Sequence, residues 1–232
     1  QGVVDCFRDV DNTLLVALDG TQYFFSEAIH CSRCQVAHHR DGRVTYSHTA
    51  LIPAVVKPGR SQVIALEPEF IHPQDGHDKQ DCESRAAERW IRRVGSLYSS
   101  LGVTLLGDAL YATQPMVRLV EEQELGYIFV AKPKQNKYLY EELEAFEKLG
   151  ELHELSRTQW TGKKHRRLVY RYANGIPLND GKDPVQVNWA ELTLMDDTGK
   201  ITFHIGFITS YTVTAQNVEE VVKAGRCRWK IE

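Results

Sequence analysis

Hydrophobic residues in the first 130 positions occur mainly in short runs, which are typical of buried strands. The run from 14 to 18 is continuous and ends at Asp19, and the run from 103 to 107 ends at Asp108. Other segments are rich in β-branched and aromatic residues, which favour strands. Together these patterns predict strands over residues 14–19, 21–29, 46–56, 62–71, 103–107 and 127–131.

Between these strands, apolar residues recur at three- and four-residue spacing, the pattern of amphipathic helices. The clearest series runs from Ala87 to Leu101, with Asp78 or Asp81 as its cap and Gly102 as its end. Further predicted helices cover residues 114–124, residues 138–149 and a last segment that opens with a capping box at residues 217–220.

Residues 152–213 differ from the rest of the chain, because they combine strand patterns with frequent turn sequences. Turns are predicted at residues 174–175, 179–181 and 197–199, each of which contains glycine. The order of elements is antiparallel strands, then β–α units, then this β-rich block. That order predicts an α/β fold, with a mixed sheet and helices on its faces.

Composition narrows the class of protein. The chain has 232 residues, 42% hydrophobic and 25% charged, which supports a sizeable core in one or two domains and excludes wholesale disorder. No apolar run approaches the roughly 18 residues of a membrane span. The net charge of −3 is not the positive charge typical of a nucleic-acid-binding protein, so any basic surface must be local.

The five cysteines and the ends of the chain support further predictions about its compartment and its extent. An odd number of cysteines at irregular spacing, without a leader sequence, predicts a reducing cytoplasm rather than a disulfide framework. Cys6, Cys82 and Cys227 are expected to be packed thiols. Because the chain begins at Gln1 and stops at Glu232 within a helical pattern, we interpret it as a fragment.

Three acids form a candidate metal-binding set. Asp19 and Asp108 stand at the ends of apolar strands, and Glu232 follows Arg228 by four residues on a predicted helix. Divalent cations relieve the repulsion between buried carboxylates and could support phosphoryl transfer. The alternatives are structural: spacing alone favours a hairpin turn at Asp19-Gly20, a turn cap for Asp108 and an exposed helix acid for Glu232.

Several segments together resemble a known family. They are ALDGTQYFFSEAIHC, YSHTAL, QDGHDKQDCE, GDALYA and GRCRWKIE, and they resemble a bacterial insertion-sequence transposase of the DDE class. The resemblance covers about residues 14–232. The chain departs from the family pattern at Gly225, where related transposases often have tyrosine, and it ends before the lysine that normally follows the glutamate.

The resemblance implies a ribonuclease-H-like catalytic domain over residues 1–232, cut at its last catalytic helix, with a β-rich insertion at 152–213. Asp19, Asp108 and Glu232 would hold two Mg²⁺ or Mn²⁺ ions, and Arg228 would orient Glu232 or contact phosphate. The implied function is strand cleavage at the element ends followed by strand transfer to target DNA.

The implied partners are double-stranded DNA and a second copy of the chain in a synaptic homodimer, in the bacterial cytoplasm at the nucleoid. Two rival functions remain at this point. One is a ribonuclease-H-like nuclease without strand transfer, and the other is a zinc-stabilised DNA-binding module without catalysis.

Basic residues gather in three acid-free stretches, at 132–138, 157–171 and 223–230. Such side chains neutralise phosphates, and an interleaved aromatic residue can stack on an unpaired base. The residues alone favour a solvated hairpin for the second stretch, whereas the family resemblance favours DNA contact beside the acidic site. The candidate DNA-binding residues are Lys132, Lys134, Trp160, Lys163, Lys164, Arg166 and Arg167.

Cys31 and Cys34 have the Cys-x-x-Cys spacing of a zinc site and fall in a polar loop between predicted strands. Nearby histidines are candidate partners, but the third and fourth ligands cannot be assigned from the sequence. The alternative is a pair of small buried residues. The sequence leaves a structural Zn²⁺ site and ordinary packing open.

Overall fold

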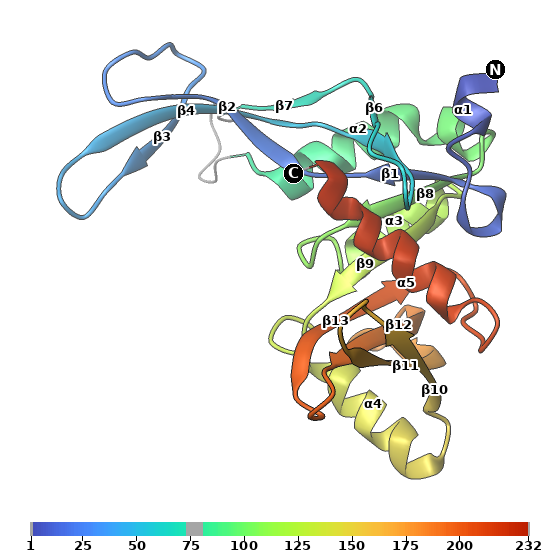
Figure 1. The fold of residues 1–232 in the computed structure, drawn as a ribbon. Helices are drawn as coiled ribbons and strands as arrows, with labels where there is room; N and C mark the ends of the chain where they lie inside the picture. The colour runs from blue at the N-terminus through green and yellow to red at the C-terminus, as the bar shows by residue number, and fades with distance from the viewer. Residues whose placement is uncertain (1, 73–80, 232) are drawn as a thin grey trace.

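The computed structural model describes residues 2–72 and 81–231, and Figure 1 shows their arrangement. The helices of these residues are α1 (Gly2–Asp5), α2 (Glu83–Ser99), α3 (Gln114–Glu122), α4 (Lys137–Leu149) and α5 (Val218–Arg226), with 3₁₀ segments η1 (Val10–Asn12) and η2 (Cys227–Ile231). The strands are β1 (Leu14–Ala17), β2 (Gly20–Ser26), β3 (Gln35–His38), β4 (Val44–Leu51), β5 (Ala54–Val56), β6 (Ile64–Ala65), β7 (Glu69–Ile71), β8 (Val103–Gly107), β9 (Gly126–Ala131), β10 (His153–Trp160), β11 (His165–Pro177), β12 (Gln186–Met195) and β13 (Ile201–Thr209).

A mixed sheet of nine strands in the described residues forms the body, in the order β10-β11-β12-β13-β9-β8-β1-β5-β6. The central strands β1, β8 and β9 are parallel, and the strands on either side of them are antiparallel. This arrangement confirms the mixed sheet expected from the sequence.

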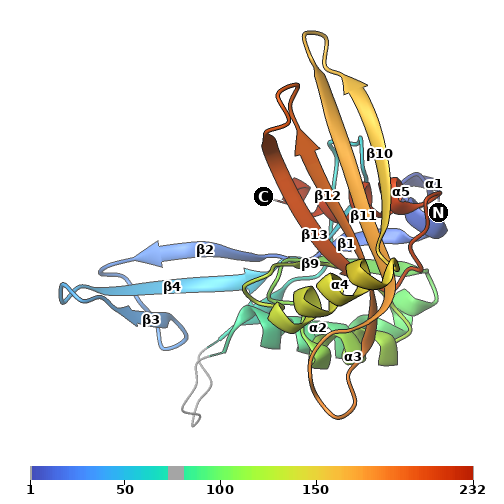
Figure 2. The ribbon, with the colours of Figure 1, turned by 90° about the horizontal axis from the view of Figure 1, so that it is seen from below.

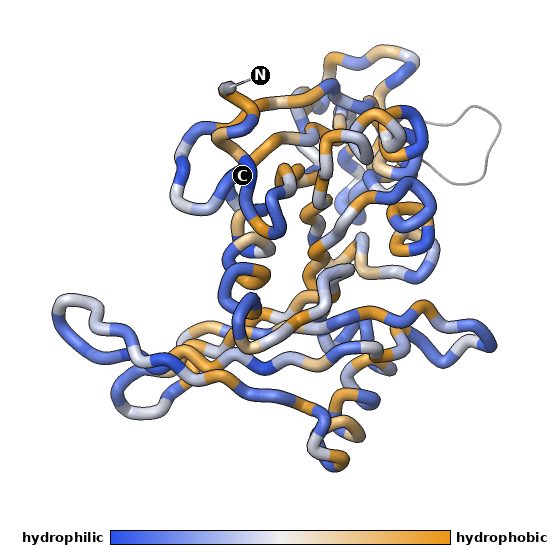
Figure 3. The backbone as a smooth tube through the Cα atoms, turned by 90° about the vertical axis from the view of Figure 1, so that its right-hand side faces the viewer, coloured by the Kyte–Doolittle hydropathy of each residue, from blue (hydrophilic) through white to orange (hydrophobic). Residues whose placement is uncertain are grey.

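Helices cover both faces of the sheet, which explains the continuous apolar runs. Leu14 and Val16 of β1 pack into a core with α2, α3 and α4, whereas Leu15 and Ala17 pack into a second core with α5. A strand buried on both faces carries no polar alternation. Figure 2 shows α2, α3 and α4 together below the sheet, and Figure 3 shows hydrophobic stretches where strands and helices pack. Within the described residues, no helix is both long and apolar enough to cross a bilayer.

A second sheet forms an arm that projects from the body (Figures 1 and 2). Its order is β2-β4-β3, and β7 also pairs with β4. The chain enters the arm through Asp19, whose carbonyl oxygen accepts a hydrogen bond of 2.9 Å from the Ile52 amide. Because β1 and β2 belong to different sheets, the hairpin alternative for Asp19-Gly20 is wrong.

The β-rich block does not form a separate sheet. Its strands β10 to β13 continue the main sheet, and β13 pairs with β9, placing Phe207 opposite Val130. The predicted turns at 179–181 and 197–199 connect β11 to β12 and β12 to β13. These two predictions are confirmed by the strand boundaries.

The predicted turn at Asn174-Gly175 is wrong. Both residues lie within β11, where the register with β12 shifts between Ala173 and Ile176. Gly175 has a φ of +68°, and the Asn174 side chain exchanges two hydrogen bonds with the Val213 backbone. The turn-forming residues here produce a β-bulge instead of a turn, because β11 stays paired with β12 on both sides of them.

The last helix begins where the sequence predicts, but not through a capping box. The Asn217 side chain accepts a hydrogen bond of 2.8 Å from the Thr214 amide and caps no α5 amide. Gly225 does not divide α5. A Cβ at Gly225 would stand 2.7 Å from the Phe207 ring, so glycine allows α5 to lie close against the sheet.

The structure also bears on the predicted cap of α2 and on the predicted burial of three cysteines. Asp81 precedes the N-cap residue of α2, whereas Asp78 lies outside the described residues. Cys227 is buried as expected, but Cys6 and Cys82 are exposed, so the expectation of packed thiols is wrong for those two.

Candidate active site

Asp19 and Asp108 lie at one edge of the main sheet. They follow the neighbouring parallel strands β1 and β8, in which Ala17 pairs with Leu106. The Leu18 amide donates to the Leu106 carbonyl oxygen at 2.9 Å, so the parallel pairing continues to the residue before Asp19. Because parallel strands run in the same direction, their carboxyl ends place both acids at the same edge.

Glu83, the first residue of α2, is a third acid at this edge. Its Oε1 accepts a hydrogen bond of 2.7 Å from the Tyr111 hydroxyl. Burial raises the pKa of the Glu83 carboxyl, the Tyr111 hydrogen bond opposes that rise, and the negative charges of Asp108 and Asp19 raise it further. Asp108 and Asp19 therefore both act electrostatically on Glu83.

The sequence prediction missed Glu83. Its only signal is its place at the end of the QDGHDKQDCE segment, because it follows no apolar strand. A helix-terminal acid is common for other reasons, since acids favour the first turn of any helix.

Two glycines make room for this arrangement. A Cβ on Gly20 would stand 2.5 Å from Oε2 of Glu83, so the Glu83 carboxylate occupies the space beside the backbone that follows Asp19. A Cβ on Gly107 would stand 2.8 Å from the Tyr111 ring. Gly107 thus lets Tyr111 pack on β8 and reach Glu83.

Asp108 caps a turn and also carries a charge that acts on its neighbours. Its Oδ1 accepts a hydrogen bond of 2.8 Å from the Leu110 amide, which closes a turn after β8. The same carboxylate acts electrostatically on Glu83 and Tyr111. The turn holds the carboxylate in place without removing it from the acidic cluster.

Arg228 brings a positive charge to the acids from η2. Its side chain is 10% exposed, and Nη1 lies 3.8 Å from Oδ1 of Asp19. The Lys230 ammonium donates to the Arg60 carbonyl oxygen and so ties η2 to the β5–β6 loop. Glu232, four residues after Arg228, lies outside the described residues.

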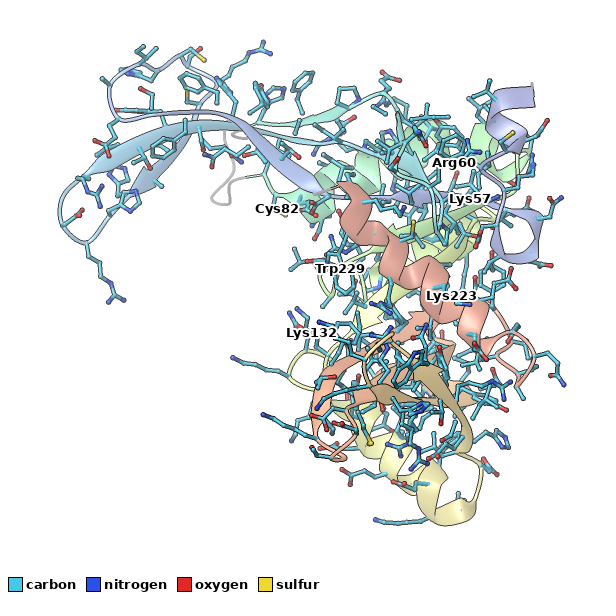
Figure 4. All side chains as sticks on the ribbon, in the orientation of Figure 1. Lys57, Arg60, Cys82, Lys132, Lys223 and Trp229 are labelled. Carbon is cyan, nitrogen blue, oxygen red and sulfur yellow. The ribbon has the colours of Figure 1, made fainter. Side chains whose placement is uncertain are left out.

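A pocket of about 260 Å³ opens beside Asp108. Its lining includes Asp108, Lys132, His204, Arg228 and Trp229. Lys132 and Trp229 come from different parts of the chain and lie near each other in Figure 4. One wall is β13, so the β-rich block contributes directly to this pocket.

His204 adds a titratable group to the pocket wall. Its Nε2 lies 2.7 Å from Oε2 of Glu191, a side chain that is 7% exposed. The hydrogen bond to Glu191 raises the pKa of His204, although partial burial opposes the rise. The imidazolium form therefore persists to higher pH than in an isolated histidine.

The basic run of the second stretch lies on the hairpin formed by β10 and β11. This hairpin carries the exposed side chains of Trp160, Lys163, Lys164 and Arg167 and the half-buried side chain of Arg166. Strands β12, β13 and β9 separate β11 from β8, a distance of four strand spacings, or about 19 Å. The run is therefore separated from β8 by three strands, and its place beside the acidic site stays a prediction, whereas Lys132 lines the pocket and Lys134 lies two residues beyond it.

Cys31 and Cys34 lie on the arm, in the loop between β2 and β3. Their sulfur atoms are 3.9 Å apart, within the separation of about 4 Å expected for zinc ligands. His48 of β4 lies beside both of them.

A family model described as "Transposase DDE domain" matches residues 9–232. No curated protein matches the chain.

Proposed function

Because the chain belongs to the transposase DDE domain family, we propose that it carries out phosphoryl transfer on DNA at the sheet edge beside Asp19 and Asp108. The mixed sheet with helices on both faces is the ribonuclease-H-like fold that this family implies. DNA is the substrate of a transposase, and such enzymes use divalent metal ions.

The observation that supports this location is the proximity of Asp19, Asp108 and Glu83, in which both aspartate charges act on the Glu83 carboxyl. Three carboxylates in one partly buried cluster are a set of hard oxygen donors, which suits Mg²⁺ or Mn²⁺. We propose that Asp19, Asp108 and Glu232 hold two such ions. Bound there, the ions would activate the attacking oxygen and stabilise the leaving oxygen.

The chain's own residues would bind and orient the DNA. Arg228 lies against Asp19 and would orient Glu232 or pair with a phosphate, as the resemblance implies. Lys132 places a further positive group in the pocket that contains Asp108, and His204, whose pKa is raised by Glu191, lines the same pocket. The turn that holds Asp108 fixes one carboxylate before substrate arrives, which avoids reorganisation during the reaction.

The proposed reaction consists of two exchanges of a P–O bond. Water first attacks a phosphorus at the element end, and the 3′-oxygen leaves as a hydroxyl. That hydroxyl then attacks a phosphorus of the target strand and displaces the target's 3′-oxygen. We propose that a homodimer holds two element ends during these steps, at the bacterial nucleoid.

The β10–β11 hairpin is proposed to contact the same duplex. It lies about 19 Å from β8, and a turn of B-DNA is about 34 Å long, so one duplex could contact both sites within a single turn. The basic run would therefore bind phosphates away from the reacting one.

The Asp108→Asn variant tests the proposed catalytic role of Asp108. Asparagine keeps an oxygen that can accept the Leu110 hydrogen bond, so the fold should be preserved. It removes a negative charge, and we expect cleavage to fall about a hundredfold or more, because a metal ligand contributes several kcal/mol. The measurement uses a duplex from the ends of the genetic element, in Mg²⁺, with thermal midpoints recorded in chelator.

Asp41→Asn is the matched control, because Asp41 is an exposed acid on the arm that pairs with Arg43. It should cleave like the unmodified protein. An Asp108→Asn protein that also cleaves at the unmodified rate would remove Asp108 from the metal site. If the unmodified protein cleaves the element ends but forms no products joined to target DNA, its function is that of a nuclease without strand transfer.

A further inference from the structure

A second cluster of chemically reactive side chains lies on the arm, away from the acidic site. The ligand atoms of Cys31, Cys34 and His48 lie within 4.8 Å of one another. The Cys31 and Cys34 sulfurs are 3.9 Å apart, and Nε2 of His48 lies 3.4 Å from each sulfur. In the part of the chain that the structure describes, this is the one group of three ligand-type side chains that converges in this way.

The distances match a tetrahedral zinc ion. Zn–S bonds of about 2.3 Å and a Zn–N bond of about 2.0 Å place two sulfurs about 3.8 Å apart, and sulfur and nitrogen about 3.5 Å apart. A disulfide would require the sulfurs to stand about 2.05 Å apart. The observed separations are those of ligands around one ion.

The backbone around the two cysteines is already folded as a metal-binding turn. The Cys31 amide lies 3.3 Å from the Cys34 sulfur, and the Arg33 amide lies 3.4 Å from the Cys31 sulfur. The Cys34 amide donates to the Cys31 carbonyl oxygen at 3.2 Å. Amides directed at sulfur stabilise its anionic form, which is the form that binds metal.

Simple packing of two small thiols does not account for the cluster. Cys34 is buried but Cys31 is exposed, so the pair does not belong to a shared apolar core. His48 is held in place by its neighbours: its ring stacks on Tyr23 and is tilted against Phe24. An imidazole nitrogen directed between two sulfurs serves metal binding better than it serves an apolar contact.

The arm also lacks a core of its own. Every residue of β2 and β3 is partly or fully exposed. A small sheet with few buried side chains needs an additional cross-link, and a metal is one of the few that a reducing compartment permits. A metal bound here would join the β2–β3 loop to β4.

We propose that Cys31, Cys34 and His48 bind a structural Zn²⁺ ion. Two thiolates and one imidazole form a soft donor set that selects zinc over magnesium. The ion stabilises the arm and takes no part in phosphoryl transfer.

Metal content tests the proposal directly. Protein purified in reducing buffer should contain about one zinc per chain by elemental analysis, and Cys34→Ser should reduce the content to near zero. Cys82→Ser is the matched control, because Cys82 is an exposed cysteine outside the cluster, and it should retain zinc. Protein that contains no zinc and takes up none when reduced would overturn the proposal.

Two further variants keep the test informative if Cys34→Ser fails to fold. His48→Cys supplies another zinc ligand and should retain the metal, whereas His48→Phe keeps a ring but should lose it. Cobalt replacement adds a spectroscopic readout: Co²⁺ bound to thiolate should give visible absorption in His48→Cys and not in Cys34→Ser. Identical Co²⁺ spectra in the unmodified protein and in Cys34→Ser would contradict the assignment.

The zinc proposal stands apart from the catalytic proposal. Asp108→Asn should lose cleavage yet keep zinc, and chelation of zinc should expose residues 27–48 to protease before it exposes the body. Protease sensitivity of the arm that is equal with and without zinc would contradict its stabilising role.

Discussion

The carboxyl group of Glu83 connects three distant parts of the sequence. Glu83 is the first residue of α2. Its carboxyl group accepts a hydrogen bond from Tyr111, which follows β8, and fills the space beside Gly20, which follows β1. The side chain therefore contacts both segments that carry the predicted catalytic aspartates. This position makes Glu83 either a further metal ligand or a support for Tyr111, and substitution separates the two.

Glu83→Gln should weaken metal binding while preserving the fold. Glutamine can still accept the Tyr111 hydrogen bond, but the charge that would attract a cation is lost. Mn²⁺ titration followed by electron paramagnetic resonance measures the effect. Glu88→Gln, on the same helix and paired with Arg85, is the control and should bind Mn²⁺ normally. Unchanged Mn²⁺ affinity in Glu83→Gln would leave Glu83 as a support only.

The same variant has an expected pH signature in chelator. The raised pKa of Glu83 means that ionisation costs stability in the folded state, and that cost is present at neutral pH. Glu83→Gln should therefore match or exceed the unmodified thermal midpoint at pH 7. The gain should vanish as pH falls below about 4.3, where the carboxyl is protonated in both states.

At the scale of elements, an ion-pair cluster attaches α2 to the end of β7. Arg89 donates to both carboxylate oxygens of Asp81, at 3.0 and 2.8 Å, and to Glu69 at 2.9 Å. Burial opposes ionisation of Asp81, but the hydrogen bonds and charge of Arg89 outweigh it and lower the pKa of Asp81. The pair is therefore a source of stability above the normal pKa of an aspartate.

Arg89→Gln should lower the free energy of unfolding by about 1 kcal/mol at pH 7, a value reduced for the solvent exposure of Arg89. The loss should shrink as pH falls below about 3.9, the pKa of an aspartate in the unfolded chain, and should disappear below the lowered pKa of Asp81 in the folded state, where the carboxyl is neutral in both states. Urea unfolding across this range measures it. Arg85→Gln removes only an exposed pair on the same helix and should cost less than about 0.5 kcal/mol. Equal losses of unfolding free energy in the two variants would show that the Arg89–Asp81 pair stabilises the fold no more than the exposed Arg85–Glu88 pair does.

Local patterns predicted the elements better than their pairings. Continuous apolar runs identified β1 and β8, so Asp19 and Asp108 were placed correctly at strand ends. The same local signal at Asp19-Gly20 favoured a hairpin, because turn residues cannot reveal that β1 pairs with β8 rather than with β2. At Asn174-Gly175, residues typical of a turn likewise form a bulge, because the residues on either side of them pair with β12.

The candidate sites show the same division between local and long-range information. The Cys-x-x-Cys spacing indicated Cys31 and Cys34, but His48 becomes a partner only through the register of β2 on β4, which places Phe24 opposite His48. Glu83 likewise becomes visible only when α2 packs beside β1 and β8. A single sequence contains neither of these contacts.

At the scale of the whole molecule, three strands of the main sheet lie between the basic hairpin and β8. Replacing Lys163, Lys164, Arg166 and Arg167 by alanine should therefore weaken DNA binding while leaving the cleavage rate at saturating DNA largely unchanged. The slope of log affinity against log salt should become shallower by about 0.9 for each lost phosphate contact. Fluorescence anisotropy at several salt concentrations measures both quantities.

Lys148→Ala combined with Lys182→Ala is the control, because both lysines are exposed and neither belongs to the predicted DNA-binding stretches. Its salt slope should equal that of the unmodified protein. If the hairpin variant also keeps the full slope, the basic run is a solvated surface and the duplex follows another path.

The arm meets the body at Asp19, and this junction has a mechanical consequence. The seven residues of β2 span about 24 Å, so a tilt of about 5° at the junction would carry the outer end of that strand through about 2 Å. A carboxylate at the pivot of such a lever would move far less than the tip. A tilt of this kind would move the outer end of the arm while leaving the aspartate at its root close to its position relative to Asp108.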